Sequence, residues 1–282
     1  MGRELAVHRA ETSSYNFPVV SRPISYIGSR LPRGWSDLLL QLALFFGVYQ
    51  GYQVVRGLSE AKEALAFANA DRIIDLESSI GLYFEPDMQS ALLDLSWVVD
   101  FANFMYVNSH FVITTTFLAW LYLFRNEHFY FVRNMFMVAM LLALTGYLLF
   151  PTAPPRLLTE NGMIDTIATF SGVSTDSNTV SLLVNKYAAV PSMHIGFSSM
   201  IAGVAFLLVR NPVIRVLWLG YPLLVLFVVM TTGNHFWFDG FLGALVALAS
   251  ALIASRVLAP VRPAHWAFRP APASATAPAT SG

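Results

Sequence analysis

The sequence lacks cysteine and carries few charged residues. Without cysteine the chain can form no disulfide, thiolate nucleophile or cysteine-based metal site, and this absence fits either redox environment. Only 12% of the 282 residues are charged, whereas 56% are hydrophobic, and the mean hydropathy is +0.57. A formal net charge of zero gives no indication of a nucleic-acid partner. This balance favours a protein embedded in a membrane over one in water.

Apolar runs close to the roughly 20 residues needed to cross a bilayer recur along the chain. They predict an all-α, polytopic membrane protein with one bundle of six transmembrane helices. Between the first two spans, Leu65, Ile73, Leu76 and Ile80 recur at helical spacing within a charged stretch, which predicts short interfacial helices. The six spans are expected at about residues 37–55, 101–124, 131–150, 195–209, 213–232 and 236–258.

The two ends of the chain differ in composition from the middle. Residues 1–33 contain five arginines and lack the short hydrophobic region of a signal peptide, so we expect a cytoplasmic arm. Residues 34–258 are expected to form the six-helix transmembrane domain. Residues 259–282, rich in Pro, Ala, Thr and Ser, are expected to form a disordered cytoplasmic tail.

The distribution of Lys and Arg predicts the orientation in the membrane. With the amino terminus inside, twelve of the 17 basic residues fall on the cytoplasmic side, and the opposite face holds most of the acids. Both termini are therefore expected in the cytoplasm. The 151–194 loop and the 231–239 junction must then lie together at the outer face.

Three outer-face segments that end or begin helices carry the residues capable of chemistry. Pro191 and Ser192 are good starting residues for the fourth helix and place His194 in its first turn. Free amides and the positive helix end there favour an anion such as a phosphate. The three segments are FPTAPPR at 150–156, VPSMHIG at 190–196 and GNHFWFDG at 233–240.

His235 and Asp239 are four residues apart, so their side chains share one helical face if the sixth helix begins near Asn234. An Asp that accepts from one imidazole nitrogen fixes the tautomer and makes the other nitrogen a nucleophile or base. We therefore predict a hydrogen bond between the two, with His194 facing the same pocket. Two His and one Asp could also hold zinc, although the only further imidazole in reach is His110.

PSMH followed by Gly, and then HFWFD some forty residues later, resembles the type 2 phosphatidic acid phosphatase (PAP2) superfamily over roughly residues 101–258. The resemblance implies a six-helix core and a mechanism that needs no metal or other cofactor. It implies that His235 attacks phosphorus, that Asp239 orients His235, and that His194 protonates the leaving oxygen.

Two phosphate-binding features of that superfamily are missing. Its usual first motif, a Lys followed by Arg-Pro, is absent, and Val229 replaces the Arg expected six positions before His235. FPTAPPR, together with Tyr106 and His110, instead resembles the inositolphosphotransferase branch, which includes fungal inositol phosphorylceramide synthase and its bacterial relatives. Sphingomyelin synthases share the bare HxxxD pattern.

Six residues are candidates for substrate or phosphate binding. Arg156 and Lys186 could replace the missing charge, or either could be an ordinary interfacial cation. His110 and Asn108 could line the substrate cavity or bridge helices. The candidates are Arg156, Lys186, Ser192, His110, Tyr106 and Asn108.

These features predict a lipid phosphotransferase of a bacterial plasma membrane with an extracytoplasmic active site. It would move a phosphoryl or phospho-head group, such as phosphoinositol, from a phospholipid or polyprenyl phosphate to a lipid or polyol acceptor. With water as the acceptor it would be a lipid phosphate or polyprenyl diphosphate phosphatase. A proton-coupled transporter is the alternative from another class, but the candidate residues gather at one face and not at the midplane. The substrate, acceptor and oligomeric state stay open.

Overall fold

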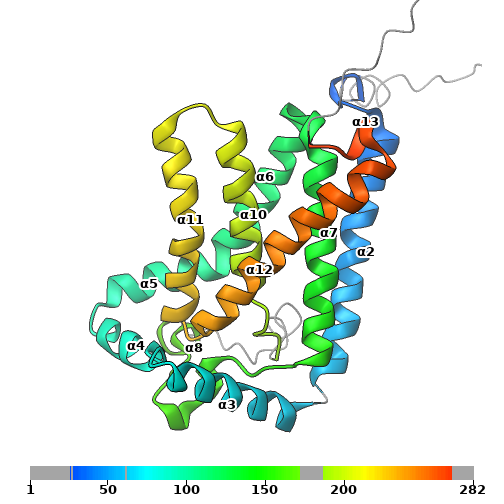
Figure 1. The fold of residues 1–282 in the computed structure, drawn as a ribbon. Helices are drawn as coiled ribbons and strands as arrows, with labels where there is room; N and C mark the ends of the chain where they lie inside the picture. Colours follow the sequence, from blue (N-terminus) through cyan, green and yellow to red (C-terminus); the bar gives the residue numbers. More distant parts are fainter. Residues whose placement is uncertain (1–25, 27, 61, 172–186, 269–282) are drawn as a thin grey trace, which may run out of the picture. The chain divides into compact units, whose positions relative to one another are not determined.

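The computed structural model describes residues 26, 28–60, 62–171 and 187–268 (Figure 1). By its contacts the chain divides into residues 1–43 and residues 44–282, and helix α2 (Gly34–Glu60) runs from the first unit into the second. Within the described ranges the second unit consists of helices and the loops that join them, and it has no strand apart from a single isolated parallel bridge between Thr152 and Ala188.

Four helices of the described part are long and apolar enough to cross a membrane, which is the character of an integral membrane protein. They agree with four of the six predicted spans. Helix α10 (Met193–Leu208) coincides with a fifth but is shorter, at 16 residues, so six spans remain a prediction. The four are Ser96–Phe124 (α5, Ser96–Phe104; η1, Met105–Ser109; α6, His110–Phe124), α7 (Asn126–Leu149), α11 (Pro212–Thr231) and Trp237–Val261 (α12, Trp237–Ile253; η4, Ala254–Leu258; η5, Ala259–Val261).

Helix α10 forms the centre of the bundle, because it packs against α6, α7, α11 and α12. Its backbone lies close to that of α12 where Gly196 faces Gly243. A Cβ atom at Gly243 would lie 2.1 Å from the carbonyl oxygen of Ser192, so no other residue fits without moving the backbone. Small residues of this kind are what allow two membrane helices to touch along their backbones.

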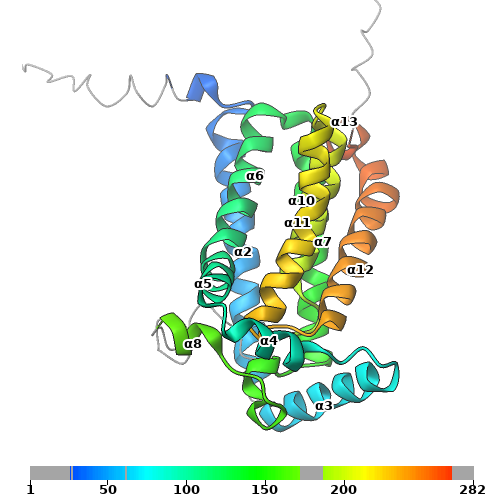
Figure 2. The same cartoon turned by 90° about the vertical axis from the view of Figure 1, so that its left-hand side faces the viewer.

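The short helices α3 (Glu63–Ser79), α4 (Glu85–Leu93) and α8 (Thr166–Ser171) gather at one end of the bundle (Figures 1 and 2). The 3₁₀ turns η2 (Pro155–Leu157) and η3 (Thr159–Asn161) lie in the loop that follows α7. The buried face of α3 carries Ala66, Ala70, Ile73 and Glu77. Of the four residues from which interfacial helices were predicted, only Ile73 is buried, whereas Leu65, Leu76 and Ile80 are exposed.

The prediction of disorder from residue 259 is wrong for residues 259–266, which form helical turns. Residues 259–261 continue α12 as a 3₁₀ turn, and α13 (Pro263–Trp266) follows. Proline near the start of each turn fixes the local backbone, and the Phe268 ring packs edge-on against Phe131 of α7 at 5.3 Å between centroids. Residues 269–282 lie outside the described residues, as do residues 1–25 of the predicted arm.

Candidate active site

The three segments singled out in the sequence converge at the end of the bundle where α3 and α4 lie. The amide of Arg156 donates to the Gly233 carbonyl at 2.7 Å, and the amide of Ser192 donates to the Asp239 carbonyl at 3.0 Å. Gly233 has φ +68°, and a Cβ there would lie 3.0 Å from the Ile164 carbonyl oxygen. Glycine is therefore required at this turn both for its backbone conformation and for space.

The predicted contact between His235 and Asp239 is present. Oδ2 of Asp239 lies 3.3 Å from Nδ1 of His235 and also accepts from the Phe236 amide at 3.0 Å. Helix α12 begins at Trp237, one residue after the predicted start of the sixth span, so the condition of a start near Asn234 is not met and His235 lies in the preceding loop. The amides of Asn234 and His235 both donate to the Val229 carbonyl, which closes a turn and delays the helix. Asp239, in the first turn of α12, reaches back to the loop.

His194 is the second residue of α10 and, as predicted, lies close to His235. The two rings are 5.6 Å apart between centroids, and the ring of Tyr106 stacks on His194 at 4.8 Å. Ser192 precedes the helix, but its side chain makes no capping bond. Its buried Oγ has no hydrogen-bond partner among the described residues, so it is available to a ligand.

A π-helical turn, η1, brings Tyr106 and His110 to this cluster. A π turn holds more residues than an α turn, which rotates the side chains that follow, and such turns are frequent at functional sites. The ring of His110 lies 4.3 Å from that of His194. Asn108, in contrast, is exposed and donates to the Phe104 carbonyl of its own helix at 3.1 Å. Its predicted place in the cluster is therefore wrong, because the π turn directs it outward.

Arg156 is the cation of the cluster, with only 5% of its surface exposed. Its guanidinium donates to Oδ1 of Asn234 at 2.5 Å and lies 3.4 Å from the carboxylate of Asp165. Burial, and then the charge of Arg156, lower the pKa of His235 to about 3. His235 is therefore neutral near pH 7 and keeps an unprotonated ring nitrogen. Lys186, the other predicted cation, lies outside the described residues.

The family model of the PAP2 superfamily matches residues 71–253, which is more than half of the chain. The chain belongs to the PAP2 superfamily. The matched region runs from within α3 to the end of α12 and so includes all three converging segments. No curated protein and no solved structure matches the chain. Membership of the PAP2 superfamily suggests a lipid-related function of the phosphatase or phosphotransferase type.

Two carboxyl groups that the sequence analysis did not select also belong to the site of this PAP2 protein. Glu85 of α4 accepts from the Trp237 amide at 2.9 Å, and Glu77 of α3 accepts from the Phe238 amide at 3.2 Å. With Asp239 on the Phe236 amide, three successive amides at the start of α12 each have a carboxyl partner. These bonds attach α3 and α4 to the helix that orients His235.

Burial and the neighbouring charge of Glu85 raise the pKa of Glu77 to about 9, and burial also raises the pKa of Glu85. Glu77 therefore keeps its proton at neutral pH. A signal for Glu77 was present in the sequence, because it continues the helical face of Ala66, Ala70 and Ile73 at a spacing of four, three and four residues. A carboxyl group within an apolar stripe indicates a buried polar contact.

Proposed function

We propose that this PAP2 protein is a membrane-embedded lipid phosphotransferase that works through a phosphohistidine on His235. It would transfer a phosphoryl or phospho-head group, such as phosphoinositol, from a phospholipid or polyprenyl phosphate to a lipid or polyol hydroxyl. The observation that carries the proposal is the pair of imidazoles, His235 and His194, whose ring centroids lie 5.6 Å apart beside Arg156.

The contact with Asp239 supports His235 as the nucleophile. Since Asp239 lies against Nδ1, it favours the tautomer with the proton on that nitrogen and leaves the lone pair on Nε2. The low pKa of His235 keeps this lone pair free of a proton near pH 7. Asp239 is fully buried, so the carboxylate holds the ring in place without competition from water.

The reaction takes place in two half-steps. Nε2 of His235 attacks phosphorus, the bond from phosphorus to the leaving oxygen breaks, and His194 supplies the proton that this oxygen takes up. The acceptor hydroxyl then gives its proton to His194 and attacks phosphorus, and the bond to His235 breaks. Arg156, the hydroxyl of Ser192 and the positive end of α10 stabilise the charge on the phosphoryl oxygens.

Water as the acceptor would give a phosphatase, which is the second candidate. Transfer to an alcohol is favoured by two features. Val229 stands where the superfamily pattern has an Arg, so a charge that would hold a phosphomonoester is absent at that position. The segment FPTAPPR also resembles the inositolphosphotransferase branch, and it supplies Arg156, the residue that lies beside His235.

The placement in the membrane is part of the proposal. We infer six spans, formed by α2, α10 and the four longer helices, with α3 and α4 lying at the interface. The exposed side chains of Leu65 and Leu76 on α3, and of Ile80 directly after it, support this because they offer an apolar surface to lipid. Both termini would be cytoplasmic and the site extracytoplasmic, in the plasma membrane of a bacterium. The division into an arm (1–33), a catalytic domain (34–258) and a tail is likewise inferred.

Purified protein incubated with labelled phosphatidylinositol, phosphatidic acid or polyprenyl diphosphate, with and without acceptor lipid, would test the function. We expect a labelled protein whose phosphate is lost in acid and kept in alkali, and labelled product only when acceptor is present. His235→Ala should give neither labelled protein nor labelled product. His194→Ala should give no labelled product, because the intermediate either does not form or accumulates without reacting further. Turnover without label on His235 would refute the phosphohistidine, and release of free phosphate regardless of acceptor would establish the phosphatase.

A further inference from the structure

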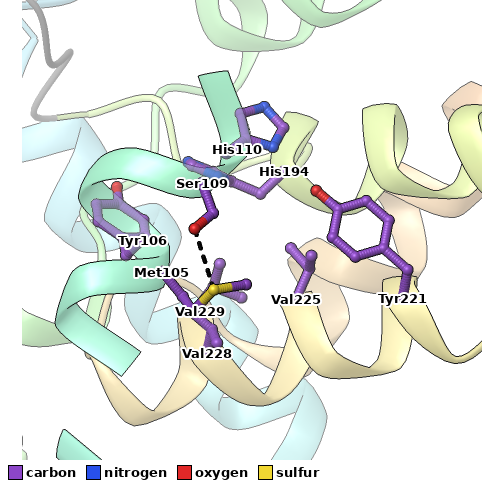
Figure 3. A pocket seen from close by; sticks show the side chains of 9 residues that line it. All are labelled: Met105, Tyr106, Ser109, His110, His194, Tyr221, Val225, Val228 and Val229. Carbon is purple, nitrogen blue, oxygen red and sulfur yellow. Dashed lines mark hydrogen bonds between the residues drawn. The ribbon is translucent and has the colours of Figure 1, made fainter. Parts of the chain in front are cut away.

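A small cavity adjoins the catalytic cluster at His194 (Figure 3). It lies between α10, α11 and the helix formed by α5, η1 and α6. Neither His235 nor Arg156 lines it. His194 therefore lies between the cavity and the side of the cluster that is proposed to bind phosphate.

The polar atoms that line the cavity are incompletely paired. Tyr221 is 8% exposed, and its hydroxyl has no hydrogen-bond partner in the described part of the chain; Nδ1 of His110 is in the same condition. Figure 3 shows the Tyr221 hydroxyl directed toward the two histidines. The hydroxyl of Ser109 bonds only to the sulfur of Met105, a weak acceptor. Buried polar atoms nearly always have partners, so unpaired ones at a single cavity point to a ligand.

The cavity walls carry no Asp, Glu, Lys or Arg among the lining residues. Three valines of α11, including Val229, supply the apolar part of the wall. A phosphate placed here would be desolvated without a counter-charge, which is strongly unfavourable. The free volume is about 10 Å³, room for one water-sized group. The cavity is thus suited to a single uncharged hydroxyl group.

We propose that this cavity, formed by Tyr106, Ser109, His110 and Tyr221 beside His194, holds the acceptor hydroxyl that attacks the phosphorylated enzyme. The inference rests on the proposed function and specifies where its second substrate binds. The hydroxyl belongs either to an alcohol or to water, and both make the same hydrogen bonds. Tyr221 and Ser109 position the oxygen, while His194 takes the proton.

The step is balanced within the site. The acceptor O–H bond breaks and its proton moves to His194, a new P–O bond forms, and the P–N bond to His235 breaks with its electron pair returning to Nε2. The proton on His194 replaces the one that the leaving oxygen took in the first half-step. No oxidant, reductant or further reactant is required.

Tyr221→Phe tests the inference because it removes the hydroxyl and keeps the ring. With phosphatidic acid as the donor and glycerol, myo-inositol or diacylglycerol as acceptors, we expect the KM for the acceptor to rise at least tenfold. The KM for the donor should stay within twofold. Ser109→Ala should have the same effect and serves if Tyr221→Phe does not fold. Tyr122→Phe is the matched control, since Tyr122 is a buried tyrosine of α6 that does not line the cavity.

The arms of the experiment separate the two sources of the hydroxyl. An effect on transfer to alcohols alone identifies an alcohol site, and a tenfold loss of hydrolysis alone identifies a water site. A raised KM for the donor alone, or wild-type kinetics in both variants, would overturn the inference. If the wild type turns over without phosphate on His235, the proposed intermediate fails, but the acceptor KM values still decide whether the cavity binds the acceptor.

Discussion

Replacing Gly243 with alanine would test whether the packing of α10 against α12 sets the geometry of the site. The new Cβ would lie 2.1 Å from the carbonyl oxygen of Ser192 and 3.2 Å from the amide nitrogen of Gly196. Real Cβ atoms essentially never approach closer than 3.0 Å, so the two helices must separate by about 0.9 Å. The obstructing atoms are backbone, and no rotamer change can relieve the contact.

This displacement falls on the residues that hold His194. Ser192 precedes α10 directly, and its amide bonds to Asp239, so a shift there moves His194 relative to His235. Overpacking of this kind costs about 1–3 kcal/mol of stability, and a misplacement of about 1 Å in an active site can cost on the order of 100-fold in rate. We expect kcat of Gly243→Ala to fall about 100-fold while the protein remains folded in detergent.

Gly203→Ala is the matched control for this experiment. Gly203 lies on the same helix, α10, and a Cβ there meets no atom within 4 Å. Since alanine favours a helix over glycine by roughly 1 kcal/mol, this variant should be as active as the wild type and at least as stable. If Gly243→Ala keeps kcat within twofold of the wild type, the α10–α12 contact does not determine the distance between the histidines.

Three further outcomes can be measured. The pKa of Glu77 is raised from 4.5 to about 9 in the folded protein. The stability that this shift contributes is fully present below pH 4.5 and is lost as the pH rises to about 9. The unfolding temperature in detergent should therefore fall across this window in the wild type and fall less in Glu77→Gln, and equal slopes would contradict the assignment. Because the charge of Arg156 lowers the pKa of His235, Arg156→Ala should move the acidic limb of the kcat/KM profile to higher pH, whereas Arg156→Lys should leave it in place. An impermeant thiol reagent applied to intact cells should modify the cysteine of Glu160→Cys and not that of Arg210→Cys. The reverse result would show that the protein has the opposite orientation in the membrane.

The sequence was sufficient to predict four membrane-spanning helices and the convergence of the site. In the predicted topology of six spans, the loops at His194 and His235 meet because both follow an odd number of crossings from the same side. The contact between His235 and Asp239 was predicted correctly, although the two residues do not share a helix. Spacing alone could not reveal that the amide of Asn234 bonds back to Val229 and delays the helix.

Other features depend on contacts between distant segments. The π turn at Met105–Ser109 turns Asn108 outward and His110 inward, and no residue pattern in the sequence marks it. The sequence placed Glu77 and Glu85 only among the acids of the outer face. Their role could not be predicted, because their partners are amides about 150 residues away. A helical surface can carry two apolar faces, as α3 does, and only packing determines which one is buried.

The three carboxyl groups at the start of α12 have a consequence for how the substrate binds. The amides of residues 236–238 would otherwise form a site for an anion next to His235, but Asp239, Glu85 and Glu77 already occupy them. The protein thus supplies its own hydrogen-bond acceptors for these amides at this helix end. In the proposed mechanism a phosphate can approach His235 only from the side of α10 and Arg156, so a single binding direction is built into the fold before any substrate arrives.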